Sequence, residues 1–239
     1  MQDQFKRTSL LVGEEGINKL KCARVAVFGI GGVGGYVCEA LARSGVGTFD
    51  LVDNDVVSES NINRQIIATH NTIGMPKVLA MKERILSINP DANVNIYQDF
   101  VLETNIDNFP FDTYDYVIDC VDTVSAKIAI IMHSLQKNVK VISSMGTGNK
   151  LDPTKLLITD IYKTSICPLA KVMRHEMKKR RVKHLDVLVS TEYPIKVTNV
   201  DKEDIPLGKH TIPGSTAFVP SAAGLVIASH VVRKLIGNN

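Results

Sequence analysis

Tryptophan is absent from this chain of 239 residues, and aromatic residues make up only 5% of it. A core with so few rings has to be aliphatic, as in a parallel sheet rich in valine and isoleucine. Apolar residues nevertheless account for 44% of the sequence. We therefore expect a substantial hydrophobic core that needs neither metals nor disulfides for its stability.

Cysteine is scarce as well, with four residues in the chain, and no two of them form a C-x-x-C pair. This spacing argues against a disulfide framework and against a zinc knuckle. Cys22, Cys38 and Cys120 are interpreted as small buried apolar residues. For Cys167 two interpretations stay open, a structural residue and a reactive thiol.

Long apolar runs are also missing. The longest covers residues 222–232, includes a serine and a histidine, and is shorter than the roughly 20 residues that span a bilayer. The first residues are polar and do not resemble a signal peptide. The net charge of +3 does not by itself indicate a nucleic-acid partner. We expect a soluble, cytoplasmic protein with no membrane partner.

Strand patterns alternate with helical patterns over the first 150 residues. Apolar side chains recur at helical spacing in residues 33–41, 78–88 and 125–137. The expected strands are residues 24–30, 48–52, 94–97, 116–121 and 139–143. This alternation predicts βαβ units, and hence a Rossmann-like α/β fold whose mostly parallel sheet is flanked by helices.

The last third has a different pattern, because its strand-like segments lack regular helices between them. The expected elements are strands at 155–162, 186–191 and 195–200, and helices at 166–181 and 221–236. We predict an antiparallel C-terminal extension of the sheet and a final helix that is buried or lies at a subunit interface. The chain is interpreted as one domain, 1–239, with a nucleotide-binding core at 1–150 and a substrate-facing, dimer-supporting extension at 151–239.

A glycine-rich turn directly follows the first expected strand and precedes a helix. In this geometry backbone N–H groups can bind a phosphate at the helix N-terminus. Asp53 stands about twenty residues further on, near the end of the second strand, where a carboxylate can bind ribose hydroxyls. The candidate nucleotide-binding glycines are Gly29, Gly31, Gly32 and Gly34. On their own, these features equally fit an NAD or FAD site.

Four further residues favour a nucleoside triphosphate over a dinucleotide. Arg64 offers a fork of donors for phosphate oxygens. Lys77 begins a helix, where a cation is unfavourable unless an anion lies nearby. Asp122 follows a strand and is a candidate magnesium ligand beside phosphates. Arg7 lies far from the others in sequence. An NAD-dependent oxidoreductase stays the alternative, although that activity gives no role to Arg64, Lys77 and Arg7.

Taken together, these motifs resemble the ThiF/MoeB/HesA superfamily, the adenylating enzymes related to ubiquitin-activating enzyme. The resemblance covers about residues 5–150 well and the remainder more loosely. The motifs are Gly29-x-Gly31-Gly32-x-Gly34, Asp53-x-Asp55, Ser60-Asn61-x-x-Arg64-Gln65, Gly74-x-x-Lys77 and Asp119-x-x-Asp122. The resemblance implies an ATP site on a Rossmann-like fold, with ATP and Mg²⁺ bound together.

The family's functional residues can be carried over position by position. The resemblance implies that Asp53 holds the ribose and that Asn61, Arg64 and Lys77 contact the triphosphate, with Asp55 in the same ATP-binding set. It implies that Asp122 binds Mg²⁺. It also implies that Arg7 reaches into the ATP site of a partner subunit, so that the active unit is a homodimer. Arg7, Arg64, Lys77 and Asp122 are thus the candidate catalytic residues.

Two branches of the superfamily fit the chain unequally. Members that adenylate the C-terminus of a ubiquitin-like or sulfur-carrier protein usually carry two C-x-x-C zinc pairs, which this chain lacks; that activity stays the alternative. The chain is more similar to the branch that dehydrates threonylcarbamoyladenosine in tRNA. The stretches that carry this similarity are 28–34, 41–47, 88–90, 151–154, 168–171 and 190–192.

The second branch implies a two-step reaction on a tRNA substrate. A carboxylate of the modified nucleoside attacks the α-phosphate of ATP and releases pyrophosphate, and a nitrogen of the same side chain then closes a ring and releases AMP. The resemblance leaves open whether a sulfur-transfer protein assists and whether a monovalent cation lies at the dimer.

A tRNA substrate requires a basic surface, and one segment is dense in positive charge. Only Glu176 opposes its cations. The residues are Lys171, Arg174, Lys178, Lys179, Arg180, Arg181 and Lys183. We predict that this run contacts the phosphate backbone in a salt-sensitive manner; the alternative is an ordinary solvated helix face.

Overall fold

The computed structural model describes residues 3–197 and 213–237. Within them one seven-stranded sheet has the order β3-β2-β1-β4-β5-β7-β6. The strands are β1 (Arg24–Phe28), β2 (Thr48–Val52), β3 (Asn93–Tyr97), β4 (Tyr116–Asp119), β5 (Lys140–Ser144), β6 (Leu156–Asp160) and β7 (Asp186–Ser190). Neighbouring strands are parallel except β6 and β7, which are antiparallel.

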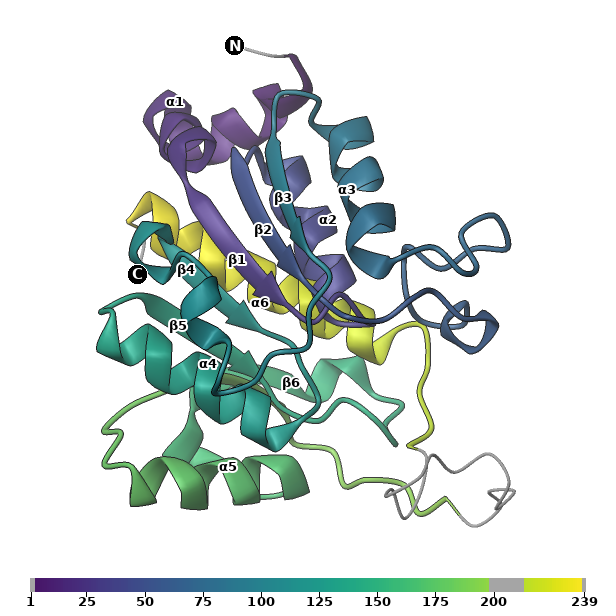
Figure 1. The fold of residues 1–239 in the computed structure, drawn as a ribbon, viewed down its shortest axis with the longest axis vertical. Helices are drawn as coiled ribbons and strands as arrows, with labels where there is room; N and C mark the ends of the chain where they lie inside the picture. The colour runs from purple at the N-terminus through teal and green to yellow at the C-terminus, as the bar shows by residue number, and fades with distance from the viewer. Residues whose placement is uncertain (1–2, 198–212, 238–239) are drawn as a thin grey trace.

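Helices cover both faces of the sheet (Figure 1). They are α1 (Lys6–Cys22), α2 (Gly34–Ser44), α3 (Lys77–Ile88), α4 (Val124–Gln136), α5 (Pro168–Lys179) and α6 (Val219–Ile236). Short 3-10 turns lie at Asp3–Phe5, Glu59–Asn61, Ile106–Asn108, Phe111–Thr113, Pro153–Lys155 and Ile161–Lys163.

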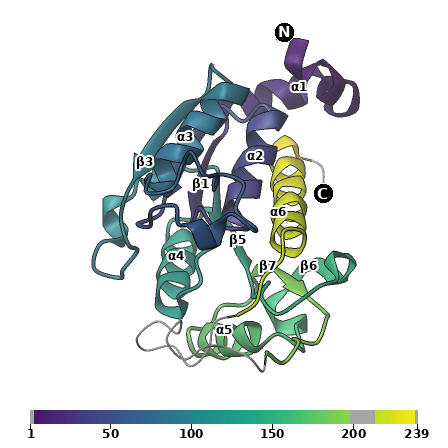
Figure 2. The same cartoon turned by 90° about the vertical axis from the view of Figure 1, so that its right-hand side faces the viewer.

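The hydrophobic core has two layers, one on each face of the sheet. Residues of α2, α3 and α6 form the first layer with one set of strand side chains. Residues of α4 and α5 form the second layer with the opposite set. Figure 2 shows α6 running beside α2, and Gly224 makes this approach close, because a Cβ there would lie 2.5 Å from the Val33 carbonyl oxygen.

The predicted fold class is confirmed, including the antiparallel pair in the last third. The sheet continues through β7, which pairs in parallel with β5, so only the edge strand β6 reverses direction. The expected strand at 195–200 is wrong over residues 195–197, which form no strand. Ile195 instead donates its N–H to the Asn149 carbonyl oxygen at 2.8 Å. Residues 198–200 lie outside the described part of the chain.

Sequence analysis did not predict helix α1. Its helical pattern is interrupted at Gly13, where φ is 75° and ψ is 170°. Its large apolar residues also lie on different sides, since Ile17 and Leu20 are buried whereas Leu10 and Leu11 are 82% and 87% exposed. The segment therefore carries no single apolar stripe from which a helix could be inferred.

Helix α6 is longer than the apolar run from which it was predicted. It spans 18 residues and is apolar enough to cross a membrane by length and composition. Its side chains at Ala223, Ile227 and Val231 are nevertheless fully buried in the first core layer. One face of the helix is thus buried, whereas Leu225 is 49% exposed, and the expected alternative of a subunit interface stays a prediction.

A buried ion pair joins α4 to the ends of two strands. Lys127 and Asp119 both have fully buried side chains, and the Lys127 Nζ lies 3.1 Å from Asp119 Oδ2. The ammonium also donates to the Ser144 carbonyl oxygen at 2.7 Å, and Ser143 Oγ donates to Asp119 at 2.6 Å. Burying a charge is costly, and pairing and hydrogen bonding of this kind offset that cost. The cluster ties the last residue of β4 to β5.

We predict that Lys127→Met lowers the free energy of unfolding by about 3–5 kcal/mol, because it leaves a buried carboxylate without its counter-charge. Urea denaturation measures this loss. Lys137→Met is the matched control, since its pair with Asp112 is 37% and 72% exposed and should contribute about 1 kcal/mol or less. Equal unfolding free energies for the two variants would contradict the prediction.

Candidate active site

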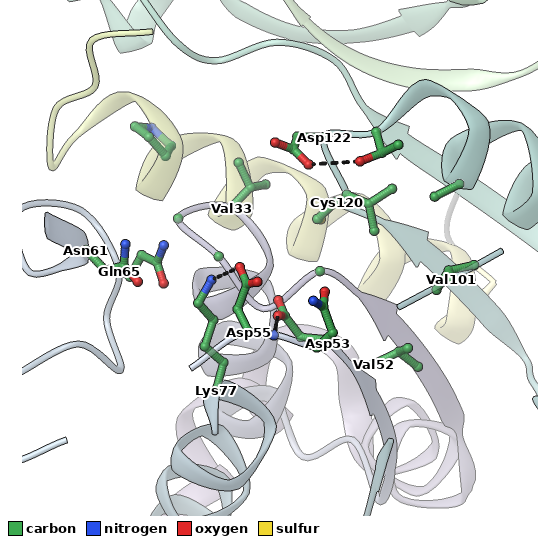
Figure 3. A pocket seen from close by; sticks show the side chains of 18 of the residues that line it. Val33, Val52, Asp53, Asp55, Asn61, Gln65, Lys77, Val101, Cys120 and Asp122 are labelled. Carbon is green, nitrogen blue, oxygen red and sulfur yellow. Dashed lines mark hydrogen bonds and ion pairs between the residues drawn. The ribbon is translucent and has the colours of Figure 1, made fainter. Parts of the chain in front are cut away.

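A cavity of about 350 Å³ lies at the carboxyl ends of the central strands (Figure 3). Strand β1 has β2 on one side and β4 on the other, so the chain order reverses at this point. Crevices at such switch points are where open α/β sheets bind ligands. Gly29 N donates to the Val52 carbonyl and Cys120 N to the Phe28 carbonyl, each at 2.8 Å, which draws the three strand ends together.

The glycine turn divides into cavity-lining and packing positions. Gly29, Gly31 and Gly32 line the cavity. Gly29 has φ 88°, and a Cβ on it would lie 2.8 Å from the Cys120 backbone. Gly34 does not line the cavity; a Cβ there would lie 1.9 Å from the Gly29 carbonyl oxygen. This contact supports a packing role for Gly34 at the start of α2, and its assignment to the nucleotide-binding set stays a prediction.

Asp53 clamps the glycine turn onto the end of β2. Its Oδ2 accepts the Ile30 N–H at 2.6 Å and its Oδ1 accepts the Asp55 N–H at 2.8 Å. Burial, the largest cause, raises the pKa of Asp53, while Lys77 and the two N–H donors oppose the shift. The carboxylate also lines the cavity, so it can hold the turn and face a ligand.

Lys77 is held at the cavity by Asp55. It is 5% exposed and is the first residue of α3, and its Nζ lies 2.7 Å from Asp55 Oδ2. A cation at a helix N-terminus opposes the helix dipole, and this carboxylate offsets that repulsion. Both side chains line the cavity, with Asp122 on its opposite side (Figure 3).

Arg64, Asn61 and Gln65 come from the loop after β2 and line the same cavity. The Arg64 guanidinium donates to the Ser60 carbonyl oxygen at 2.8 Å, and burial lowers its pKa. Asn61 and Gln65 are buried. Gln65 Oε1 has no hydrogen-bond partner in the described part of the chain. Gln65 ends the motif that contains Asn61 and Arg64, but the sequence alone did not indicate it as a site residue.

Asp122 suits a magnesium ion that is held mostly by phosphates. It lines the cavity three residues beyond the end of β4 and accepts a hydrogen bond from the Thr123 hydroxyl at 3.4 Å. Asp119, three positions earlier, is engaged by Lys127. No three His, Cys, Asp or Glu side chains gather among the described residues as a metal cage. Magnesium commonly uses one or two carboxylates together with substrate phosphates, and Asp122 fits that pattern.

Several cavity residues escaped sequence analysis. They come from the loop after β3, the loop after β5 and the start of α6, and they include Asp99, Phe100, Val101, Thr147, Ser215 and Pro220. None belongs to a local motif. Only the sheet order brings these distant segments to the glycine turn.

Arg7 does not line the cavity formed by this chain. It belongs to α1, which runs directly into the start of β1, at the opposite end of the sheet from the glycine turn (Figure 1). Its assignment to a partner subunit's site stays a prediction.

The basic run of α5 is only partly available to a ligand. Lys171, Lys178, Lys179, Arg181 and Lys183 are exposed. Arg174 instead donates to the Thr164 carbonyl and hydroxyl oxygens, both at 2.6 Å, and Arg180 pairs with Glu176. The predicted tRNA contact by Arg174 and Arg180 is therefore weakened, because both guanidinium groups already have partners within the chain.

The cysteines lie in different environments. Cys22, the last residue of α1, is exposed, so the expectation that it is buried is wrong, whereas Cys38 is buried as predicted. Cys120 lines the cavity, and burial raises the pKa of its thiol, which keeps it protonated and a poor nucleophile. Cys167 is 1% exposed, and its reactivity stays an open alternative.

A mostly parallel sheet, a glycine turn at the switch point and a crevice that holds Arg64 and Lys77 define a Rossmann-like nucleotide-binding protein. The chain belongs to the ThiF family, whose model matches residues 5–239. The predicted family is thus confirmed. Over 243 residues the chain is 43% identical to the tRNA threonylcarbamoyladenosine dehydratase of Bacillus subtilis (strain 168), covering 99% of this chain and 96% of the relative.

Solved structures are similar over the whole chain. The tRNA N6-threonylcarbamoyladenosine dehydratase of Escherichia coli, TcdA, in complex with ATP superposes with a TM-score of 0.89 at 33% identity, covering 99% of this chain and 95% of that chain. The same protein in complex with AMP superposes with a TM-score of 0.88. That protein therefore binds both nucleotides on the same fold.

Two glycine substitutions should separate packing from nucleotide contact. Gly34→Ala should lower the free energy of unfolding by about 1–3 kcal/mol or more, since its methyl would meet the Gly29 carbonyl oxygen at 1.9 Å. Gly31→Ala should keep near-normal stability, because its methyl would meet only Gln65 Nε2 at 3.9 Å. We expect it to weaken ATP binding by about tenfold, since it fills space beside the phosphate-binding backbone.

Chemical denaturation and ATP titration of both proteins test this pair. A Gly34→Ala protein as stable as the unmodified chain would contradict the packing role of Gly34. A Gly31→Ala protein with unchanged ATP affinity would contradict the nucleotide contact of Gly31.

Proposed function

We propose that this chain is an ATP-dependent enzyme that dehydrates threonylcarbamoyladenosine in tRNA by adenylating its carboxylate. The observation that carries the proposal is that one cavity at the switch point is lined by Arg64, Lys77 and Asp122 together with the glycine turn. The full-length similarity to dehydratases of that name supports the substrate.

The first step joins two anions, and the cavity supplies the charge that this requires. A carboxylate oxygen attacks the α-phosphorus of ATP, the bond to the bridging oxygen breaks, and pyrophosphate leaves. Lys77 and Arg64 would neutralise phosphate oxygens in a cavity, where fixed charges act more strongly than in bulk water. Magnesium, held by Asp122, would add further neutralisation of the phosphates when bound.

The second step completes the loss of water. A nitrogen of the same side chain attacks the activated carbonyl carbon, a ring closes, and the bond to the AMP oxygen breaks. The nitrogen loses its proton, and the original carboxylate oxygen departs with AMP. The contribution of the protein here is positioning, because nucleophile and carbonyl belong to one substrate that has to be held in a reactive conformation.

The remaining assignments follow the same site. Asp53 would hold the ribose, Asn61 the triphosphate, and Asp55 would keep Lys77 oriented. Arg7 would complete the site of a second copy. A homodimer that involves α1 is supported by the exposure of Leu10 and Leu11 on that helix, since exposed apolar side chains favour association.

Incubation with threonylcarbamoyl-modified tRNA and magnesium–ATP should convert the nucleoside into a product lighter by one water, with release of AMP and pyrophosphate. Nucleoside mass spectrometry measures the conversion. Lys77→Ala should lower kcat/KM by about 100-fold or more through loss of transition-state charge stabilisation. Lys82→Ala, on the same helix but outside the cavity lining, is the matched control. Pyrophosphate release only upon addition of a sulfur-carrier protein would favour the alternative activity.

Charge reversal on α5 should affect tRNA but not ATP. Lys178→Glu combined with Lys179→Glu should weaken tRNA binding by about tenfold or more. It should also make the affinity less dependent on salt, because a protein with fewer phosphate contacts releases fewer counterions when it binds. Lys137→Glu with Lys140→Glu, exposed residues near the start of β5, match the charge change. Filter binding at several salt concentrations is the measurement, and equal tRNA affinity of the two double variants would exclude this surface.

A further inference from the structure

A second cavity of about 410 Å³ adjoins the nucleotide cavity. The two share several lining residues, among them Arg64, Asp122 and Thr147. The second cavity is otherwise lined mainly by the loop after β5, the start of α5 and residues 213–215. A group bound in it would therefore lie beside the wall that also faces the nucleotide.

Lys150 lines the second cavity and is 3% exposed. No described residue accepts a hydrogen bond from its ammonium group or forms an ion pair with it. The other buried lysines of the described chain each have a carboxylate partner, Asp55 for Lys77 and Asp119 for Lys127. A buried ammonium without an anion is costly, so its environment favours an anionic ligand.

The start of α5 adds a second source of positive potential. Cys167, Pro168 and Leu169 line the cavity, and no side chain caps the helix. The N–H groups of a first helical turn carry partial positive charge and bind anions. Asp122 is the one acidic side chain among the described lining residues, against the cations Arg64 and Lys150.

We propose that the second cavity receives the carboxylate-bearing side chain of the substrate nucleoside, and that Lys150 binds this carboxylate. The assignment rests on the proposed function, because it identifies the anion as the group to be adenylated. With the carboxylate neutralised by Lys150 and the nucleotide by Lys77 and Arg64, the two anions can approach each other across their shared wall.

The test measures how much more tightly each protein binds tRNA that carries the modified nucleoside than tRNA that lacks it. Binding of modified and unmodified tRNA is measured in the presence of a non-hydrolysable ATP analogue, for the unmodified protein, Lys150→Met and Lys150→Arg. Lys155→Met is the matched control, because Lys155 is exposed and lies on the same segment. We expect the modification to strengthen binding about 10- to 100-fold in the unmodified protein and in Lys155→Met.

In Lys150→Met this gain should disappear, while affinity for unmodified tRNA and for the ATP analogue stays unchanged, and Lys150→Arg should restore part of it. An unchanged gain in Lys150→Met, or no gain in the unmodified protein, would overturn the inference. An equal loss of ATP-analogue affinity would also overturn it, by placing Lys150 in the triphosphate site. If Lys150→Met fails to fold by thermal melting, Lys150→Gln replaces it.

Failure of the proposed function has a different signature. In that case the modification still strengthens binding through Lys150, but no pyrophosphate or lighter nucleoside forms upon addition of magnesium–ATP. If the reaction proceeds while the gain in affinity is independent of Lys150, the proposed function stands and the assignment of Lys150 falls.

Discussion

The close packing of the glycine turn against the strand ends is the constraint on which the site depends. Gly34 approaches the Gly29 carbonyl so closely that a Cβ would lie 1.9 Å from its oxygen. This contact sets the start of α2 against β1, and the Asp53 carboxylate fastens the turn to β2 through the Ile30 N–H. Because glycine has no side chain, the helix, the turn and the strands can approach closely, and the cavity lies where they meet.

Electrostatics then distinguishes the parts of the site. Each of three buried lysines has a different environment: Lys127 is paired with Asp119 in the core, Lys77 is paired with Asp55 at the cavity, and Lys150 lines the second cavity without a described partner. The first pair stabilises the strand ends, the second keeps a cation beside the nucleotide position, and the third leaves its charge available to a ligand. The same residue type thus serves stability and binding according to its partner.

Much of the fold and the site could be predicted because both are locally encoded. Asp53 and Asp122 lie within three residues of the ends of β2 and β4, and carboxyl ends of neighbouring parallel strands meet at one edge, so their convergence follows from the alternation of elements. Helix α1 could not be predicted, since Gly13 interrupts it and its apolar side chains share no face. Lys127 gave no signal either, because a lysine within a helical pattern is usually solvated.

The sequence by itself determined the fold class, the glycine turn and the cationic residues near it, because hydrophobic periodicity and short motifs act over a few neighbouring residues. Only the tertiary structure decided that Arg174 and Arg180 are engaged within the chain and that the buried Lys150 lines a cavity together with Asp122. Those outcomes depend on which distant segments the strand order brings together, and no local pattern carries that information.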